Sequence, residues 1–439
     1  MTLLIVLGAI ILLFILTINK VNPFLAILAV AIGCGFALSM PATQILKSIE
    51  QGVGSTLGSV VLILWMGVIL GKFLEKSGAA QVISVALIRL FGVRNIHWAI
   101  LCTGFVVGIP LFYNAGFILL IPLVFSIHRT SGKPLLWIAI PMAASLSITH
   151  AFLPPHPGPA TLSSMLGASI SEVLIYGFIL AVPLALIAGI FFPKFLNPAI
   201  ASVELPISSV KEIDHIEDPP SLGTALLFTL LPVGLIATPA ILSLVNMQKE
   251  GFGALLYFLG DSFIALFITV CFVCLYLGIR KKRKVSRMMP WVVEAMESIA
   301  MIVAIIAAGG IFKQILIDSQ AAEEIKNLMT NLHIHPLIAG WLIAAILRVT
   351  LGSATIAGIT AAGMVLPLTV STSVSPELMV LSVGAGSIFF SHVNDTGFWM
   401  FKEFLHLSVR QTLLSWSLME TIISLLGLSG VLILNTFVG

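Results

Sequence analysis

The stretch Ser391-His392-Val393-Asn394-Asp395-Thr396-Gly397-Phe398-Trp399 interrupts an apolar span that begins at Leu378. A helix facing hydrocarbon has no reason to hold His, Asn, Asp and Thr within five residues, because a charged group at bilayer depth costs at least ~3 kcal/mol and normally faces a cavity. The small and polar residues also let the backbone leave the helix, which a bilayer tolerates only where protein or water satisfies the freed groups. The stretch therefore predicts a broken helix that lines a polar site. The alternative is a polar loop outside the membrane.

The composition is that of a polytopic membrane protein. Hydrophobic residues make up 59% of the 439 residues and charged residues 9%, whereas a soluble chain carries roughly 25% charged residues. Apolar runs of about 20 residues recur from end to end, and the first, at 3–18, lacks the basic start of a signal peptide, so we expect it to be a retained span. The net charge of +3 gives no indication of nucleic-acid binding, and the four cysteines have no metal-site or disulfide spacing. No metal and no cofactor is expected.

Several apolar spans are too short to cross a hydrocarbon core of ~30 Å, and they occur in pairs around small polar tips. One pair flanks Gly108–Gly116 and the other flanks Thr350–Thr355, so each pair predicts a re-entrant helical hairpin. The segments 67–80 and 309–322 are also identical at six of 14 aligned positions, and similar elements follow both. These features indicate an internal repeat.

Basic residues predict the orientation of the chain. The run Arg280–Lys284 is expected in the cytoplasm by the positive-inside rule, and counting crossings outward from it places both termini in the periplasm. An odd number of crossings per repeat makes the two repeats inverted. We therefore expect an all-α polytopic membrane protein with two inverted repeats, each with about five transmembrane helices, one of them broken, and one re-entrant hairpin. The expected units are a first repeat at 1–196 with hairpin 96–127 and broken helix 134–170, a cytoplasmic linker at 197–221, and a second repeat at 222–439 with hairpin 336–373 and broken helix 376–410.

Inverted repeats whose broken helices and hairpins meet near the bilayer midplane are a design of secondary transporters. Helix N-termini at such tips attract negative charge, and the hydroxyl, amide and imidazole groups there suit a polyhydroxylated anion. A passive channel is a different class. A membrane-embedded enzyme is disfavoured because the chain has neither an HExxH nor a GxSxG motif. The residues expected to contact substrate are Asn114, Thr149, His150, His156, Gly158, Thr161, Arg348, Gly352, Ser353, Thr355, Ser391, Asn394 and Thr396.

The two hairpin tips and the two helix interruptions, 150–161 and 391–396, form four polar tips, and Asp395 is the only carboxylate in them. An acid in a partly dry cavity can load and release a proton near neutral pH. His156 and His392 are competing proton carriers, because histidine titrates near neutrality. Three alternatives stay open. Asp395 can cap a helix without titrating, His156 can belong to a rigid proline-rich turn, and Arg348 can form a structural pair instead of meeting a carboxylate.

Three strings carry a family resemblance: Gly108-Ile-Pro-Leu-Phe-Tyr-Asn-Ala-Gly-Phe117, His150-Ala-Phe-Leu-Pro-Pro-His-Pro-Gly-Pro159 and Asn394-Asp-Thr-Gly-Phe-Trp399. At these residues the chain resembles the gluconate:proton symporter (gluconate permease) family, within the wider ion-transporter group of elevator-type carriers. The resemblance implies a carrier of gluconate or a related sugar acid in the bacterial inner membrane, driven by proton entry and working as a homodimer.

Two features keep the substrate and the coupling ion open. Members of the family carry other substrates, so a carrier of another small hydroxy acid or of an amino acid such as D-serine, coupled to sodium, is the alternative. Many members also have Asp or Glu where this chain has Asn114. A proton would then have to use Asp395 or a histidine.

Overall fold

The computed structural model describes residues 2–19, 21–196, 218–245, 247, 250–319, 335–371, 374–393 and 395–438. Every secondary-structure element in these ranges is a helix. Seven helical stretches are long and apolar enough to cross a membrane. The structure thus confirms the expected all-α polytopic membrane fold. Most of the predicted linker at 197–221 lies outside the described residues, as does Asn394.

The first half of the chain, up to residue 196, folds into ten α-helices, and a π-helical stretch, Ala185–Phe191, joins the last two. These helices are α1 (Thr2–Ile18), α2 (Pro23–Ala37), α3 (Ala42–Ser77), α4 (Ala79–Phe91), α5 (Ile96–Gly108), α6 (Tyr113–Ser131), α7 (Leu135–Phe152), α8 (Pro157–Leu166), α9 (Ile170–Leu184) and α10 (Phe192–Phe195).

The described part of the second half, from residue 218 onward, continues in the same all-helical manner, with a π-helical stretch at Leu413–Ser417 before the last helix. Its helices are α12 (Leu222–Leu244), α13 (Gly251–Leu259), α14 (Ser262–Leu275), α15 (Val285–Ser298), α16 (Ala300–Asp318), α18 (Pro336–Leu351), α19 (Ala354–Ser371), α20 (Pro376–Ser387), α21 (Thr396–Phe404), α22 (Val409–Thr412) and α23 (Leu418–Val438).

Both halves contain one succession of elements: a long helix, a helix pair, a helix that stops and restarts, and a final long helix. In the first half these are α3, α5 with α6, α7 with α8, and α9. In the second half they are α16, α18 with α19, α20 with α21, and α23. The direction in which each copy crosses the membrane stays a prediction.

Local sequence explains where the two helices stop and restart. α7 ends at Phe152 because two prolines follow shortly, each lacking a backbone N–H and clashing with the preceding turn, and α8 begins with Pro157 in its first turn, where proline is favourable. α20 ends at Ser387, and α21 begins after Asp395, whose side chain accepts a hydrogen bond from the Gly397 N–H at 3.0 Å. Each break therefore has a residue-level cause.

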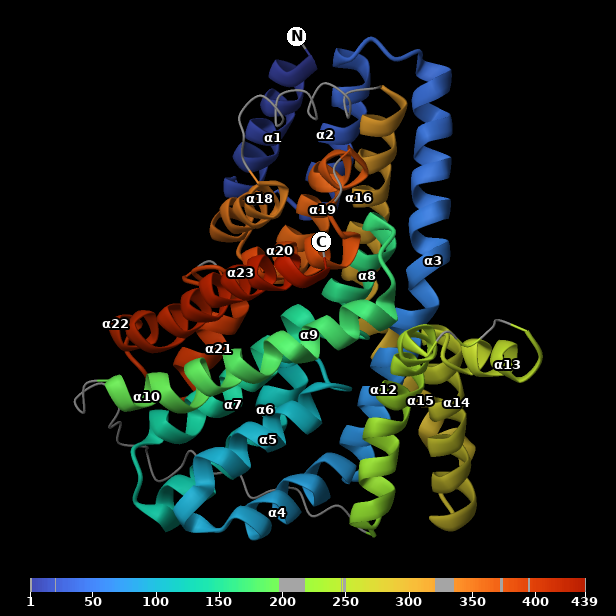
Figure 1. Ribbon diagram of the computed structural model, residues 1–439. Helices are drawn as coiled ribbons and strands as arrows, with labels where there is room; N and C mark the ends of the chain where they lie inside the picture. Colours follow the sequence, from blue (N-terminus) through green and yellow to red (C-terminus); the bar gives the residue numbers. More distant parts are fainter. Residues whose placement is uncertain are drawn as a thin grey trace.

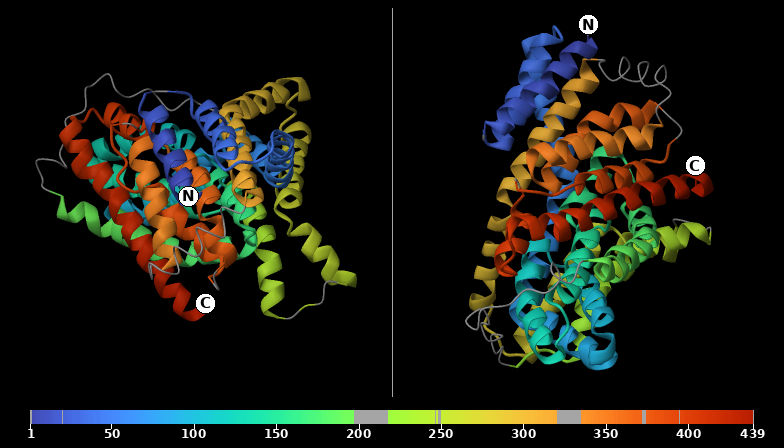
Figure 2. Two further views of the ribbon diagram at one scale, coloured as in Figure 1. Left: turned by 90° about the horizontal axis from the view of Figure 1, so that it is seen from above. Right: turned by 90° about the vertical axis from the view of Figure 1, so that its left-hand side faces the viewer.

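The last helices of the second half, α18 to α23, stack on α6 to α9 of the first half (Figure 2, right; orange and red on green and teal). α20 packs against α7 and α9, and α23 packs against the same two helices. The crossing of α7 and α20 is close: a Cβ atom on Gly384 would lie 2.6 Å from the carbonyl oxygen of Ala151. This stack positions the polar tips of the two halves opposite each other.

A second group of helices flanks this stack. α3 runs along one edge of the molecule (Figure 1), packs against α16, and also contacts α14 and α15. At the α3–α16 crossing, a Cβ atom on Gly52 would lie 2.5 Å from the Gly310 carbonyl oxygen, so two backbones meet directly. The long helix of each half thus packs against that of the other half.

Candidate functional site

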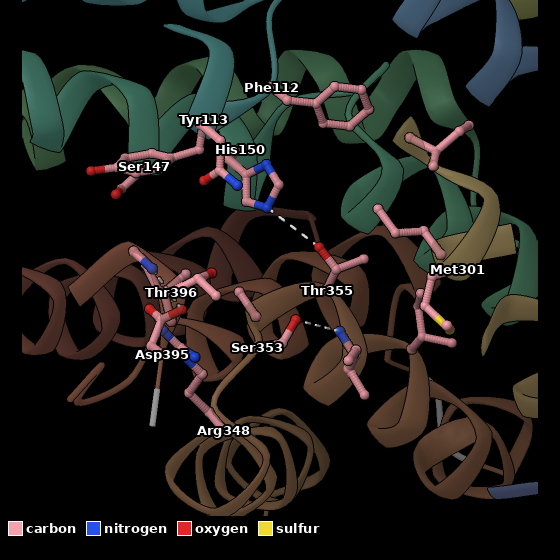
Figure 3. A pocket seen from close by; sticks show the side chains of 18 of the residues that line it. Phe112, Tyr113, Ser147, His150, Met301, Arg348, Ser353, Thr355, Asp395 and Thr396 are labelled. Carbon is pink, nitrogen blue, oxygen red and sulfur yellow. Dashed lines mark hydrogen bonds and ion pairs between the residues drawn. The ribbon is translucent and has the colours of Figure 1, made fainter. Parts of the chain in front are cut away.

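A cavity of about 390 Å³ lies between the polar tips of the two halves. Figure 3 shows Tyr113, Ser147 and His150 of the first half facing Thr355 and Asp395 of the second half across it. A volume in this range suits a small-molecule ligand. The lining residues with a polar or ionisable side chain are Tyr113, Asn114, Ser147, His150, Ser298, Arg348, Ser353, Thr355, Asp395, Thr396, Trp416 and Glu420.

An ion pair between Arg348 and Asp395 lies in the second-half wall of the cavity. Arg348 comes from the last turn of α18, and its Nη2 atom donates to Oδ2 of Asp395 at the start of α21. The two residues are 3% and 8% exposed. The Nε and Nη1 atoms of Arg348 have no hydrogen-bond partner among the described residues. A buried guanidinium with free donors can bind a carboxylate or phosphate in a fork geometry.

The carboxylate of Asp395 is held in place by a chain of hydrogen bonds. Ser391 Oγ donates to Asp395 Oδ2, and Trp416 Nε1 donates to Ser391 Oγ at 2.8 Å. Asp395 also accepts from the Gly397 N–H, as described above. Because each carboxylate oxygen has a donor, Asp395 is fully partnered and fixes the position of the Arg348 guanidinium.

The N-terminal ends of three helices reach the cavity. α6 begins at Tyr113, α19 at Ala354 and α21 at Thr396, and all three residues line it. Gly352 has a φ of +72°, so it ends α18 in the left-handed conformation that glycine adopts without strain. Gly352 thus acts through the backbone, by turning the chain from α18 into α19. The dipoles of these helices favour negative charge in the cavity.

His150, at the end of α7, links the two walls. Its Nε2 atom lies 3.4 Å from Thr355 Oγ1 on α19, and its Nδ1 atom has no partner in the part of the chain that the structure describes. Asn114 is exposed at the start of α6 and lines the same cavity. Hydroxyl, amide and imidazole groups from both halves therefore line the same cavity as Arg348.

The structure brings together seven of the predicted contact and coupling residues around this cavity, and it places the other predicted residues that it describes elsewhere. His156 does not line it: the residue is 4% exposed, its Nε2 atom lies 2.7 Å from the Gly108 carbonyl oxygen, and its ring packs edge-on against Phe112. Thr149 Oγ1 donates to the Leu146 carbonyl oxygen at 2.9 Å. The seven predicted residues that line the cavity are Asn114, His150, Arg348, Ser353, Thr355, Asp395 and Thr396.

The other predicted residues that the structure describes lie behind or beside the cavity. Thr161 is buried in α8 and Gly158 lies in the first turn of the same helix, and neither lines the cavity. Ser391 is buried behind Asp395, and the half-buried His392 ring packs edge-on against Phe390. This geometry favours the structural alternative for His156 and gives Ser391 a supporting role.

Sequence reasoning missed Glu420, which lines the cavity from α23 and is 2% exposed. Its Oε1 atom accepts a hydrogen bond from Ser147 Oγ, and its Oε2 atom has no partner among the described residues. A signal was available, because a lone carboxylate inside the apolar span Val409–Val438 marks a functional candidate by default. The cavity also reaches a helix break at Ile299, between α15 and α16, that no sequence pattern announced.

The similarity to known transporters covers the whole chain. The model for "GntP family permease" matches residues 1–437. The high-affinity gluconate transporter of Escherichia coli (strain K12) is 44% identical over 428 residues, which are 98% of this chain and 98% of the relative. The Gnt-II system L-idonate transporter of the same strain is 43% identical over 436 residues, 99% of either chain. The gluconate permease of Bacillus subtilis (strain 168) is 41% identical and covered to 98%.

Two solved structures share the fold. The YdaH transporter of Alcanivorax borkumensis superposes with a TM-score of 0.66, with 91% of this chain and 90% of that chain covered. MtrF of Neisseria gonorrhoeae, which belongs to a class of antimetabolite efflux pumps, gives a TM-score of 0.68 over 91% of this chain and 86% of its own. At 16% identity, both similarities concern the fold alone. The chain belongs to the GntP family of permeases, which are membrane transporters and not enzymes.

Proposed function

We propose that this permease is a secondary active transporter that carries gluconate or a related sugar acid, together with a proton, across the bacterial inner membrane. The observation that carries the proposal is the Arg348 guanidinium, which is buried at the cavity with two nitrogen atoms unpartnered among the described residues. The names of the relatives, which are gluconate and L-idonate carriers, support the same substrate class.

In this proposal the substrate carboxylate binds the free side of Arg348, near the N-termini of α19 and α21. A charge-assisted pair in a dry site is stronger than a neutral hydrogen bond. The hydroxyl groups of the sugar chain bind Ser353, Thr355 and Thr396 on one wall and Asn114 and His150 on the other. A solute with both features spans the cavity and holds the two halves together.

Asp395 takes a different part from the one the sequence favoured. Because its carboxylate is fully partnered, we assign it the orientation of Arg348 and not the binding of the coupling proton. His156 is engaged with the Gly108 backbone, so we assign it to the structure of the turn. His392, outside the cavity lining, has no assigned contact with substrate.

The proposal also includes a homodimer that moves substrate by an elevator motion, with both termini in the periplasm. The family resemblance supports the first two features, and the distribution of basic residues supports the third. Labelling of single cysteines placed at the described ends of α1 and α23, in intact cells with a membrane-impermeant reagent, checks the orientation. Labelling only after the cells are permeabilised contradicts it.

The experiment that tests the proposal is uptake of labelled gluconate into proteoliposomes that contain the purified protein, with an inward proton gradient and no sodium. We expect accumulation that a protonophore abolishes. Entry without accumulation would indicate a passive channel or another coupling ion. Uptake of labelled D-serine that gluconate does not inhibit, with no uptake of gluconate, would indicate the alternative, an amino-acid carrier of the same fold.

A further inference from the structure

Glu420 is a buried carboxylate that the binding scheme above leaves without a task. It lies in the third position of α23, is 2% exposed, and is linked to α7 by the hydrogen bond from Ser147 Oγ. Its second oxygen, Oε2, has no partner among the described residues. Burying an ionised carboxylate with a single hydrogen bond is costly, whereas the neutral acid needs far less solvation.

The charged groups around Glu420 are few and belong to the cavity. Arg348 on α18 and Asp395 before α21 interact with it electrostatically, and so does the buried Tyr113 on α6. His150, on the same helix as Ser147, is the other titratable side chain of the cavity lining. Since Asp395 is bound directly to Arg348, the positive charge of Arg348 is already matched before any substrate enters.

The net charge of the cavity explains why a proton is needed for the anion to bind. Arg348 and Asp395 together are neutral, so an ionised Glu420 gives the cavity one negative charge. A sugar-acid anion would raise this to two negative charges in a space of about 390 Å³. Like charges in a low-dielectric space repel strongly. A proton on Glu420 removes one of the two charges and lets the anion bind.

We infer that Glu420 is the proton-binding residue of the transporter, and that its protonation is required for the sugar-acid anion to bind beside Arg348. The inference rests on the proposed function and names the group that couples its two solutes. One proton from water on the open side of the cavity forms an O–H bond on Glu420, and Oε1 keeps the hydrogen bond from Ser147. After the cavity opens to the other side, the anion leaves and the same proton returns to water.

The test measures proton uptake on gluconate binding by the full-length protein in detergent. Titration calorimetry in buffers of different ionisation enthalpy gives the number of protons taken up per gluconate. At a pH high enough for Glu420 to be ionised in the free protein, we expect about one proton per gluconate for the wild type and an affinity that falls about tenfold per pH unit. Glu420→Gln, which stays neutral, should bind gluconate with no proton uptake and with an affinity that is flat across pH. In proteoliposomes it should exchange gluconate but no longer accumulate it.

Two further variants keep the inference testable even where Glu420→Gln does not fold. In Ser147→Ala the ionised carboxylate loses its hydrogen-bond donor, so the fall in gluconate affinity should begin at a higher pH. Glu403→Gln is the matched control, because Glu403 is exposed and pairs only with Lys402 among the described residues, and it should keep the wild-type pH profile.

The outcomes separate the inference from the proposed function. Proton uptake and pH dependence that persist in Glu420→Gln, or an unshifted profile in folded Ser147→Ala, would overturn the role of Glu420 while the symporter stands. A wild-type protein that takes up no proton on binding gluconate at any pH, and whose affinity does not change with pH, would overturn the proton coupling itself, and this inference with it.

Discussion

The two helix breaks, one in each half of the chain, resemble each other in sequence character but differ in what their polar groups contact. The break between α7 and α8 turns its histidine inward: His156 bonds to the Gly108 backbone and its ring packs on Phe112. The break between α20 and α21 places Asp395 and Thr396 on the cavity and pairs Asp395 with Arg348. The polar groups of the first break thus contact other parts of the protein, whereas those of the second break line the cavity. We call them the closed break and the open break.

This difference concerns which groups satisfy the polar side chains in membrane helices. A polar side chain at bilayer depth must be satisfied, but either the backbone of a neighbouring helix or a ligand can do so. His156 and Thr149 have backbone partners, and neither residue lines the cavity. Arg348 and Glu420 each have atoms without a partner in the described part of the chain, and both line the cavity. An unsatisfied atom does not mark the site by itself, because Thr103, Thr161 and Thr360 also have hydroxyl groups without a partner among the described residues but do not line the cavity. Position at the cavity is therefore the second requirement.

The largest effect is expected at the open break. Arg348→Ala removes the anion-binding group and leaves Asp395 as an unpaired buried charge, so we expect gluconate uptake in proteoliposomes to fall at least ~100-fold. The double variant Arg348→Ala with Asp395→Asn removes both charges. It should recover thermal stability but not transport. Wild-type uptake by the double variant would show that Arg348 serves only to hold Asp395.

The crossing of the two broken helices can be disturbed without touching the cavity lining. Gly384→Ala places a Cβ atom 2.6 Å from the Ala151 carbonyl oxygen, so α7 and α20 must move apart. We expect a loss of about 1–3 kcal/mol of stability, seen as a lower melting temperature in detergent. Gly234→Ala on α12 is the control, because no neighbouring atom lies within 4 Å of its Cβ position. Equal melting temperatures for the two variants would contradict the close crossing.

The closed break should respond in stability and not in affinity. His156→Phe keeps an aromatic ring against Phe112 but loses the hydrogen bond to the Gly108 carbonyl oxygen, which costs about 1 kcal/mol or more. We therefore expect a lower melting temperature and a gluconate Kd within about twofold of the wild type. A Kd raised tenfold or more, at unchanged stability, would return His156 to the substrate site.

The smallest effect is expected for one hydroxyl group on the second-half wall of the cavity. Thr355→Val removes a hydrogen-bonding group that faces the cavity, and we expect the KM for gluconate uptake to rise about fivefold, equivalent to about 1 kcal/mol. Thr369→Val on the same helix is the control, because its hydroxyl group bonds to the Val365 carbonyl oxygen within α19. A KM that moves equally in both variants would indicate a general effect on α19.

Much of the fold could be predicted from the chain alone because its causes are local. Apolar length and scarce charge predict membrane helices, and prolines after Phe152 and the capping residue Asp395 account for two helix ends. The break at Ile299 between α15 and α16 escaped prediction, since no proline or run of polar residues marks it. Glu420 was not predicted for a different reason: it is a single acid within a long apolar helix and does not belong to a polar tip.

Hydrophobicity, proline and helix capping act on neighbouring residues, so the class of protein, the helical elements and the residues able to carry charge follow from the chain alone. Which polar atoms remain unsatisfied depends on atoms brought together from distant parts of the chain, so it is a property of the folded molecule. Asp395 is partnered by Arg348, 47 residues before it. His156 is satisfied by Gly108 and Glu420 by Ser147, 48 and 273 residues away. At the cavity wall, these long-range contacts leave polar atoms of Arg348 and Glu420 without a partner among the described residues.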